Sequence, residues 1–600
     1  MPDTGAIPPR FADARIAAML EAPVLPTLLR LAAPNLGEAA ARIAFLAADA
    51  VFIGWLGPEA LAGVSLALPL FLLTQMVSAS GFGTGVAAGV ARALGAGRRA
   101  EAEGLAAHAL WIAVAAAALV GFGMLAFGPA LYAAFGAKGA ALDAAVTWSA
   151  IVFGGGIVVW TQNLLANVVR GTGRMAVSAG AIVAGEAVHL ALSPLLVLGW
   201  GSVPSLGVAG AAIAVLAAYA TGAGMLLWHL AGRERPVRLM RAAFVPQRAL
   251  FHAILGVGGL ASANILLFQA AAMLATALVA GSGAMALAGF GAAQRLELLQ
   301  LPLAFALGSA VIAMVAANLG AGQPARAARV ACVGAALSAL IGLDFALLAL
   351  LWPEGWMRLF LDDPGAVSTG AAYLRAIGWV LPALGLGLGV VFALFGAGRA
   401  GWPALAGGLR LAMLAAGGMA LPWLEASELP ALFTLVAGAA LIFAVALLPA
   451  SWPVLHAAGS DSGAARGRSG GFGLSLHRKA SAGCRPWEED DASWTTCPAW
   501  RRRLRDAAHC CAGTAGMARP AAALHHQRAG RRRVRHLPAH PGESHAGAAG
   551  PGPLHRSAPR RRWDDRGPDS HTGGGQPQLR DQPHRLARHQ PGGVPQSWRL

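Results

Sequence analysis

The chain has 600 residues, of which 56% are hydrophobic, only 12% are charged and 78 are glycine. Soluble domains carry about 25% charged residues, so this composition excludes a typical soluble enzyme and favours helices packed in lipid. The formal net charge is +17, and most of it lies beyond Ala457, where the chain holds 24 Lys and Arg against 11 Asp and Glu.

The N-terminal segment, residues 1–23, shows no basic region followed by an apolar core. We therefore expect a cytoplasmic segment here rather than a cleaved signal peptide. Within it, Arg10–Leu20 has the pattern of an amphipathic helix that lies on the membrane surface.

Long apolar stretches follow, separated by short connections rich in Gly, Pro and Arg. About 20 apolar residues cross a bilayer as a helix. We therefore predict an all-α polytopic membrane protein. Its twelve transmembrane helices are expected at residues 25–52, 59–85, 104–128, 145–168, 177–199, 207–230, 250–278, 284–314, 326–352, 371–393, 403–422 and 430–450.

The arginines predict the orientation of these helices. Thirteen arginines lie in the connections after even-numbered helices, whereas the connections after odd-numbered helices hold only Lys138 and Arg358. Cytoplasmic loops are enriched in Lys and Arg. We therefore expect both termini in the cytoplasm and the protein in the bacterial cytoplasmic (inner) membrane.

Three short motifs recur along the chain, which indicates two parallel repeats of six helices each. Duplicated halves around a central site are typical of secondary transporters, and no ATP-binding P-loop motif is present. The motif pairs are Leu94–Gly97 with Leu319–Gly322 and Arg170–Arg174 with Phe395–Arg399, both at an offset of 225 in the numbering, and Ala60–Gly63 with Ala286–Gly289, at an offset of 226. The predicted parts are residues 1–23 (N-terminal segment), 24–232 (first lobe), 233–249 (linker), 250–457 (second lobe) and 458–600 (tail).

The first predicted helix carries three ionisable residues, Glu38, Arg42 and Asp49. Such residues cost several kcal/mol in lipid unless they face protein or water. At 100° per residue, all three lie within about 40° of one helix face. Glu38 and Arg42, four residues apart with the acid first, favour a structural ion pair. Asp49 has no basic neighbour one turn away on its helix, so it is the leading candidate for proton or cation coupling.

The fourth predicted helix carries Asn163 and Asn167, one turn apart. Amides on one face either bind a ligand or join neighbouring helices, and the sequence does not decide between the two. Trp160 on the same helix either contacts a hydrophobic cation through its ring or packs in the core.

The fifth predicted helix presents Glu186, His189 and Ser193 on one face. A Glu–His pair in a cavity carries protons, and a hydrogen bond between helices is the structural alternative. Neither Cys nor a second His lies nearby at ligand spacing, so we expect no metal site here.

The second half is poorer in acids. Arg295 and Glu297 in the eighth predicted helix are interpreted as packing or gating residues. Asp344 in the ninth is either paired, with Arg410 of the eleventh as a candidate partner, or faces lipid in its neutral form.

Several of these segments resemble the multidrug and toxic-compound extrusion (MATE) family in order over about residues 25–450. The segments are Pro34–Leu68, Leu94–Gly97, Val169–Arg174, Leu198–Gly201, Asn318–Gly322 with Arg326, Gly396–Arg399, and Arg410.

The resemblance implies twelve helices in two six-helix, V-shaped lobes. It also implies alternating-access export of amphipathic organic cations in exchange for H⁺ or Na⁺. Pro34 and Asp49 match the first-helix proline and the carboxylate that this family uses in proton coupling. Many members have an Asn and an Asp on the fifth helix where this chain has His189 and Ser193, and Glu186 is a candidate replacement.

The seventh helix also departs from the pattern, because it has Asn264 and Gln269 where some Na⁺-coupled members carry an acid. We therefore favour H⁺ as the coupling ion. The expected coupling residues are Asp49, Glu186 and His189; the expected cavity residues are Glu38, Asn163, Asn167, Ser193, Trp160, Asn264 and Gln269; and the expected gating or structural residues are Pro34, Arg42, Arg295, Glu297 and Arg410.

We expect no enzymatic activity, no cofactor and no specific nucleic-acid partner, and we expect a monomer in the lipid bilayer. The alternatives are a lipid-linked precursor flippase of a related fold and a major-facilitator transporter. The basic tail, residues 458–600, has no apolar periodicity, so we expect it to be disordered. Its 23 Arg against one Lys also fit translation of a GC-rich gene in a shifted reading frame.

Overall fold

The computed structural model describes residues 13–199, 204–232, 236–421 and 429–450. The chain divides into two units, residues 1–519 and 520–600, and every described residue belongs to the first. The predictions for the tail lie outside the described residues, and the boundaries of the five predicted parts remain predictions.

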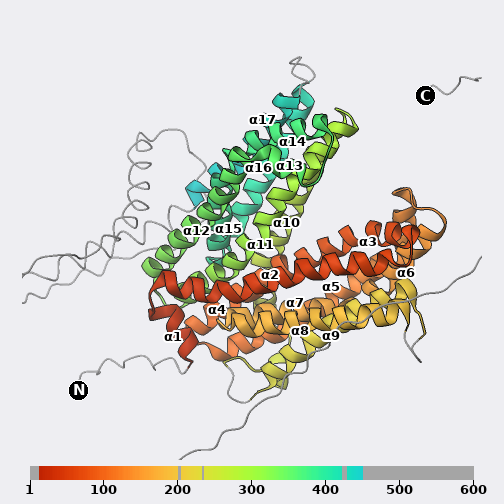
Figure 1. Cartoon of the computed structure of the whole chain (residues 1–600). Coiled ribbons are helices and arrows are strands. Elements are labelled where there is room, and N and C mark those ends of the chain that lie inside the picture. Colours follow the sequence, from red (N-terminus) through yellow and green to blue (C-terminus); the bar gives the residue numbers. More distant parts are fainter. Residues whose placement is uncertain (1–12, 200–203, 233–235, 422–428, 451–600) are drawn as a thin grey trace, which may run out of the picture. The chain divides into compact units, whose positions relative to one another are not determined.

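All secondary-structure elements among the described residues are helices (Figure 1). The first repeat contains α2 (Val24–Gly54), α3 (Pro58–Met76), the π-helix η1 (Val77–Phe82), α4 (Gly83–Gly95), α5 (Arg99–Ala134), α6 (Gly139–Gly154), α7 (Gly156–Gly171), α8 (Met175–Leu198) and α9 (Gly207–Ala231). It is preceded by α1 (Ala14–Glu21) and followed by the 3₁₀ turn η2 (Arg241–Phe244). The second repeat contains α10 (Arg248–Ala280), α11 (Ala284–Gly320), α12 (Pro324–Leu351), α13 (Pro353–Arg358), α14 (Pro364–Gly378), α15 (Leu381–Gly396), α16 (Gly401–Ala420) and α17 (Leu429–Ala446).

The candidate membrane spans among the described residues correspond to eleven of the twelve predicted helices. Among the described residues, nine helices are long and apolar enough to cross a membrane, and two bent helix pairs raise the number to eleven. The helix α2 is the twelfth; it is 31 residues long and carries the charged residues of the first predicted span. The second span is longer than predicted, because it runs from Pro58 to Gly95 without interruption.

Two predicted spans are bent rather than straight. The pair α6–α7 bends by 52° at Gly154–Gly156, and α14–α15 bends by 55° between Gly378 and Leu381. A run of glycines in the first pair and Pro382 at the start of α15 account for the breaks. Residues 154 and 379, at the two bends, differ by 225 in the numbering, which is the offset between the repeated motifs. The bends therefore belong to equivalent positions of the two repeats.

The helix predicted at Arg10–Leu20 is present as α1 (Ala14–Glu21), with residues 10–12 outside the described range, but the predicted lipid-surface environment was wrong. The helix α1 begins at Ala14, and its apolar residues Ile16, Met19 and Leu20 are buried. Its neighbours are α2, α4 and α11, so its apolar face packs on protein rather than on lipid.

Two of the three repeated motifs end helices, and the third, Ala60–Gly63 with Ala286–Gly289, lies near the start of α3 and α11. Gly97 and Gly322 have φ angles of 73° and 71°, and Gly173 and Gly398 have 76° and 79°. Left-handed backbone favours glycine, and the hydrogen bonds at each position form the same helix-terminating pattern. The constant offset between the motifs thus reflects equivalent helix C-termini in the two repeats.

The two repeats meet through equivalent positions of α4 and α11. A Cβ atom added to Gly95 would lie 2.0 Å from the carbonyl oxygen of Ala317, and one added to Gly320 would lie 2.1 Å from that of Arg92. Since 92 and 317, like 95 and 320, are related by the repeat offset, the contact is reciprocal, as a two-fold relation requires. Arg92 adds a hydrogen bond of 3.0 Å to the carbonyl oxygen of Gly396.

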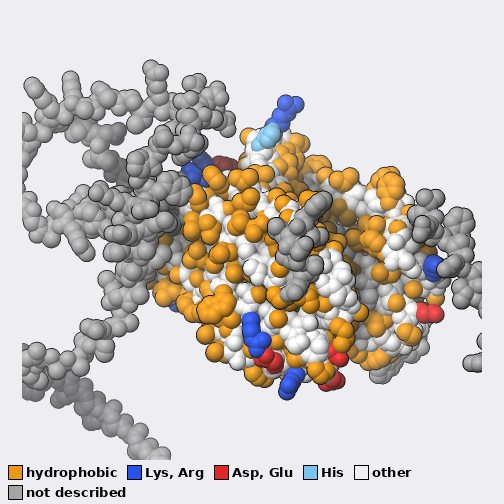
Figure 2. Space-filling model, turned by 90° about the horizontal axis from the view of Figure 1, so that it is seen from above, with side chains coloured by type: hydrophobic (Ala, Val, Ile, Leu, Met, Phe, Trp, Pro, Cys, Tyr) orange, Lys and Arg blue, Asp and Glu red, His pale blue; other side chains and the backbone are white. Residues whose placement is uncertain are grey.

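The molecular surface is apolar, as lipid contact requires. Figure 2 shows hydrophobic side chains over most of the visible face, with few charged ones among them. Large apolar side chains such as Leu119, Phe122 and Trp228 are more than two-thirds exposed.

Candidate functional site

The helices α2 and α8 pack together and bring Asp49 against His189. The Asp49 Oδ1 and His189 Nε2 atoms are 3.0 Å apart, and His189 is fully buried. The ring of Phe45 contacts the imidazole edge-on, with 4.2 Å between ring centroids. Asp49 therefore has a basic partner, which comes from another helix and is invisible to a search along its own helix.

Two polar atoms at this site have no hydrogen-bond partner among the described residues and are therefore available to bind a proton. Within the described part of the chain, His189 Nδ1 and Glu186 Oε2 are buried without hydrogen-bond partners. Glu186 lies one turn before His189 on α8 and interacts electrostatically with Arg42, His189 and Asp49. The structure thus gathers all three predicted coupling residues in one place.

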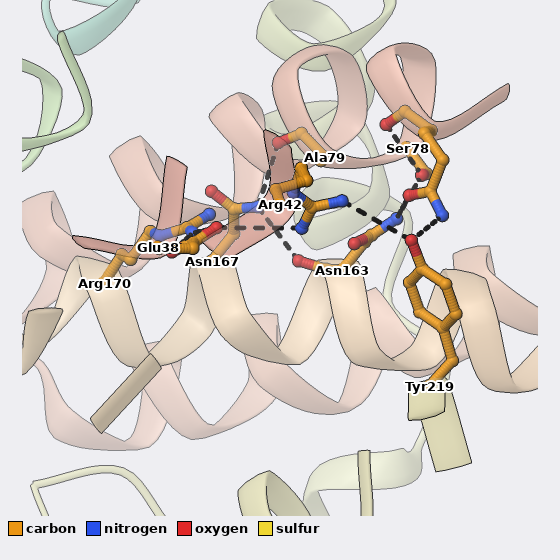
Figure 3. Close-up of polar contacts among 9 residues, drawn as sticks. Glu38, Arg42, Ser78, Ala79, Asn163, Asn167, Arg170 and Tyr219 are labelled. Atoms are coloured by element: carbon orange, nitrogen blue, oxygen red, sulfur yellow. Dashed lines mark hydrogen bonds and ion pairs between the residues drawn. The ribbon is translucent and has the colours of Figure 1, made fainter. Parts of the chain in front are cut away.

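Glu38, which lies nearer the start of α2 than Asp49, belongs to a second group of charged residues (Figure 3). Arg170 Nη2 donates to both Glu38 carboxylate oxygens, at 2.8 and 2.7 Å. The predicted pair with Arg42 is present at 3.7 Å. The stronger partner is Arg170, which lies in the last turn of α7 rather than in a connection.

A chain of polar contacts continues from Arg42 into the interior (Figure 3). Arg42 Nη1 donates to the Tyr219 hydroxyl at 3.4 Å, and Gln75 Nε2 donates to the same hydroxyl. Asn163 Nδ2 then donates to Gln75 Oε1 at 2.5 Å and to Ser78 Oγ at 2.7 Å. This chain links α2, α9, α3, α7 and η1.

The two asparagines of the fourth predicted span join helices in this structure. Asn167 Nδ2 donates to the carbonyl oxygens of Ala79 and Asn163, both at 2.9 Å. Ala79 belongs to the π-helix, a distortion of the kind that is frequent at functional sites. Trp160 is buried against Phe82, which corresponds to the packing alternative. These contacts favour helix association over direct ligand binding at these positions.

The remaining predicted cavity residues are scattered. Ser193 is fully buried on α8, and within the described residues its Oγ has no partner. Asn264 on α10 is buried, whereas Gln269 on the same helix is exposed. Pro34 lies inside α2, which continues through it.

The candidate pairing of Asp344 with Arg410 does not form. Asp344 is exposed on α12, whereas the Arg410 guanidinium lies 4.4 Å from the centre of the Phe268 ring. The electrostatic partners of Arg410 are Glu297 on α11 and Tyr373 on α14.

The other two predicted gating residues point in different directions. Glu297 accepts a hydrogen bond from the Tyr373 hydroxyl. Arg295 is exposed and lies 5.0 Å from the centre of the Phe360 ring. The two side chains therefore contact different residues although they are close in sequence.

A surface cavity of about 340 Å³ lies elsewhere, between α3, α6 and α9. Glu59, Asp143 and Thr147 supply its polar side chains, and none of the predicted site residues lines it. It is not connected with the buried charges by any contact described above.

Sequence reasoning misses Arg170, Tyr219 and Gln75. It places Arg170 in a connection because this arginine belongs to a repeated glycine motif. Tyr219 and Gln75 are single polar residues in apolar helices, and tyrosine occurs only three times in the chain, which is scarce enough to mark Tyr219 as unusual.

Among the described residues, eleven apolar spans and the charged helix α2 form two repeats, and charged residues are buried in the first repeat. This architecture is that of a polytopic membrane transporter rather than an enzyme. The MatE family profile matches residues 37–195 and 261–416. The chain belongs to the MatE family, which sets the major-facilitator alternative aside.

Relatives and solved structures agree with this assignment. The chain is 30% identical over 393 residues to a protein of Shewanella oneidensis named FAD transporter, covering 62% of this chain and 82% of that protein. It is 25% identical to a probable multidrug resistance protein NorM of Thermotoga maritima, covering 58% and 75% respectively. A crystal structure of MATE in the bent conformation superimposes with a TM-score of 0.69 at 21% identity, covering 75% of this chain and 99% of that one.

Proposed function

We propose that this protein is a secondary active antiporter that exports amphipathic organic cations in exchange for H⁺ by alternating access. The observation that carries the proposal is the buried Asp49–His189 pair with Glu186 beside it. Relatives named probable multidrug resistance proteins support the substrate class.

The exchange follows from competition for one negative charge. When Asp49 is ionised, the His189 Nε2–H donates to it, and the carboxylate attracts a cation in a site of low dielectric constant. A proton taken up by the pair removes that negative charge and weakens cation binding. Because the two groups are in contact, the proton belongs to the pair rather than to either residue. Proton and substrate then bias the protein towards opposite access states.

The chemistry of the pair favours H⁺ over Na⁺. Hard cations prefer several oxygen ligands, whereas the partner that contacts Asp49 is an imidazole nitrogen. The unpartnered His189 Nδ1 is an acceptor for a proton.

Orientation and location form part of the same proposal. The arginine distribution supports cytoplasmic termini in the bacterial inner membrane. We expect the monomer to transport, with the lobes formed by residues 24–232 and 250–457.

A test uses inverted membrane vesicles with a preformed, inside-acidic pH gradient. Ethidium addition should collapse the gradient with the full chain, and Asp49→Asn should abolish this response. Asp143→Asn removes an acid at the separate surface cavity and serves as the matched control. A response to a Na⁺ gradient alone would contradict proton coupling, and unchanged collapse by well-inserted Asp49→Asn would contradict the role of that residue.

A second candidate substrate class is supported by the relative from Shewanella oneidensis, which is named FAD transporter. On this reading the protein exports a flavin nucleotide through the same fold. Counterflow of labelled FAD against labelled ethidium in one vesicle preparation distinguishes the two classes.

A further inference from the structure

The second repeat contains a buried guanidinium that forms no ion pair with any residue that the structure describes. Arg410 on α16 is 5% exposed. Its Nε and Nη1 atoms have no hydrogen-bond partner among the described residues. The face of Phe268 on α10 lies against it at 4.4 Å, an attraction that leaves the N–H groups at the rim of the guanidinium unused.

The nearest acid does not neutralise this guanidinium. Glu297 on α11 interacts electrostatically with Arg410, but none of the ion pairs among the described residues joins the two. The carboxylate of Glu297 instead accepts the hydrogen bond from the Tyr373 hydroxyl on α14. A buried charge without a direct partner is strongly destabilising, so folding alone gives no reason for this arrangement.

The helices α10 and α11, which carry Phe268 and Glu297, hold further polar atoms without partners among the described residues. Asn264 is one turn before Phe268 on α10, and its buried Oδ1 has no partner among the described residues. A Cβ atom on Gly407, one turn before Arg410, would lie 3.0 Å from that Oδ1, so Asn264 lies against the same stretch of α16. Gln300, one turn after Glu297 on α11, likewise has a buried Nε2 without a partner in the described part of the chain. At Arg410 itself, both unpartnered atoms, Nε and Nη1, are hydrogen-bond donors.

We propose that Arg410 binds an anionic group, a phosphate or a carboxylate, of the transported solute. Two guanidinium nitrogens offer the paired donors that such groups accept. Glu297 is half-buried and competes electrostatically with the ligand for Arg410, so it weakens the site and eases release. The inference rests on the proposed transport function and extends its substrate class to amphipaths that carry an acidic group.

The test measures binding without any ion gradient, so it is independent of proton coupling. Flavin mononucleotide and riboflavin differ only by a phosphate. Their binding to the full chain in phosphatidylcholine nanodiscs is followed by flavin fluorescence. Flavin mononucleotide should bind about tenfold or more tightly than riboflavin, as expected for hydrogen bonds between charged groups.

Two variants should act with opposite signs. Arg410→Gln should abolish the preference for flavin mononucleotide, and Glu297→Gln should tighten its binding several-fold because a competing negative charge is gone. A variant that merely unfolds cannot produce tighter binding. Arg375→Gln, which removes an exposed arginine paired with Glu354, is the control and should change neither affinity.

In phosphatidylcholine nanodiscs, three results would overturn the proposal: equal binding of the two flavins, a preference that survives Arg410→Gln, or weaker binding by Glu297→Gln. Repeating the titration in nanodiscs with added phosphatidylglycerol separates a solute from a lipid headgroup. If the preference for flavin mononucleotide persists, Arg410 binds a solute. If the preference disappears, Arg410 binds an anionic lipid headgroup, and the proposal of a solute site is overturned. Because this titration uses no ion gradient, its failure overturns the Arg410 site and leaves the vesicle test of proton coupling at Asp49 unaffected.

Discussion

At the scale of single residues, the buried charges of α2 are explained by partners on other helices. The pattern of its own helix singles out Asp49, and the structure adds His189 at 3.0 Å. The same pattern pairs Glu38 with Arg42, a contact that is present but secondary to Arg170. Helical periodicity shows which residues share a face, but contacts between helices depend on packing that no single segment encodes.

Replacing the imidazole tests whether His189 holds the proton or only holds Asp49. His189→Gln keeps an N–H donor for the carboxylate but cannot take up a proton at neutral pH. We expect proton-coupled efflux to fall about tenfold or more, because a loss of one unit in the proton affinity of the site corresponds to about 1.4 kcal/mol, a factor of about ten. The midpoint of thermal unfolding should stay close to that of the unmodified chain. Full coupling by this variant would reduce His189 to a structural role.

Breaking the Glu38–Arg170 pair should destabilise the first repeat. Both side chains are about nine-tenths buried, and removing one partner of a buried pair costs about 3–5 kcal/mol. Arg170→Gln is therefore expected to lower the free energy of unfolding in detergent by roughly this amount. Arg98→Gln breaks the exposed pair with Glu101 and should cost less than about 1 kcal/mol. Equal losses in the two variants would contradict the assignment of Arg170 to the interior.

At the scale of elements, α1 connects the two repeats. Asp13 Oδ2 pairs with Arg174 at 2.9 Å at the start of α8. From the second repeat, Asn318 donates to the carbonyl oxygen of Met19 at 3.1 Å, and Arg326 donates to that of Ala22. The amphipathic pattern predicts a helix here, but pattern alone does not distinguish a lipid surface from a protein surface as the partner of the apolar face.

The attachment of α1 should depend on pH through Asp13. Partial burial raises the pKa of its carboxyl, but the hydrogen bond and charge of Arg174 and the backbone N–H of Arg15 lower the pKa below its usual value. A lowered pKa in the folded state stabilises the attachment above the unfolded pKa of about 3.9, and this stabilisation is lost as the pH falls through the folded pKa. At pH 7, Asp13→Asn should accelerate amide hydrogen exchange in α1, although Asn still caps the helix. Unchanged exchange would show that the ion pair does not anchor α1.

The reciprocal glycine contact between α4 and α11 should not tolerate a methyl group. In Gly95→Ala or Gly320→Ala, the new Cβ would lie 2.0 or 2.1 Å from a backbone oxygen of the other repeat. We expect faster hydrogen exchange at residues 92–97 and 317–322 because the two helix ends separate. Gly256→Ala on α10 meets no atom within 4 Å and is the matched control. Protection equal to that of the unmodified chain in all three variants would mean that this contact does not hold the repeats together.

At the scale of the whole molecule, duplication made most of the architecture predictable. The constant offset between the glycine motifs corresponds to equivalent helix ends. The apolar lengths predict the eleven candidate spans of the described residues, and the first predicted helix is present as α2. The bends at Gly154–Gly156 and after Gly378 are not predicted, because a bent pair has the same length and apolarity as a straight span. Arg410 stands out in the sequence, but its neighbours Phe268 and Glu297 come from two other helices and require the tertiary structure.

The most direct test of the central claim measures whether substrate and proton compete for Asp49–His189. Ethidium is added to the purified full-length chain in weakly buffered detergent, and proton release is recorded with a pH indicator. The unmodified chain and Asp143→Asn should release a proton on binding, and Asp49→Asn should bind more weakly and release none. Equal release from Asp49→Asn, or ethidium binding without release in the unmodified chain, would contradict exchange by competition at this pair.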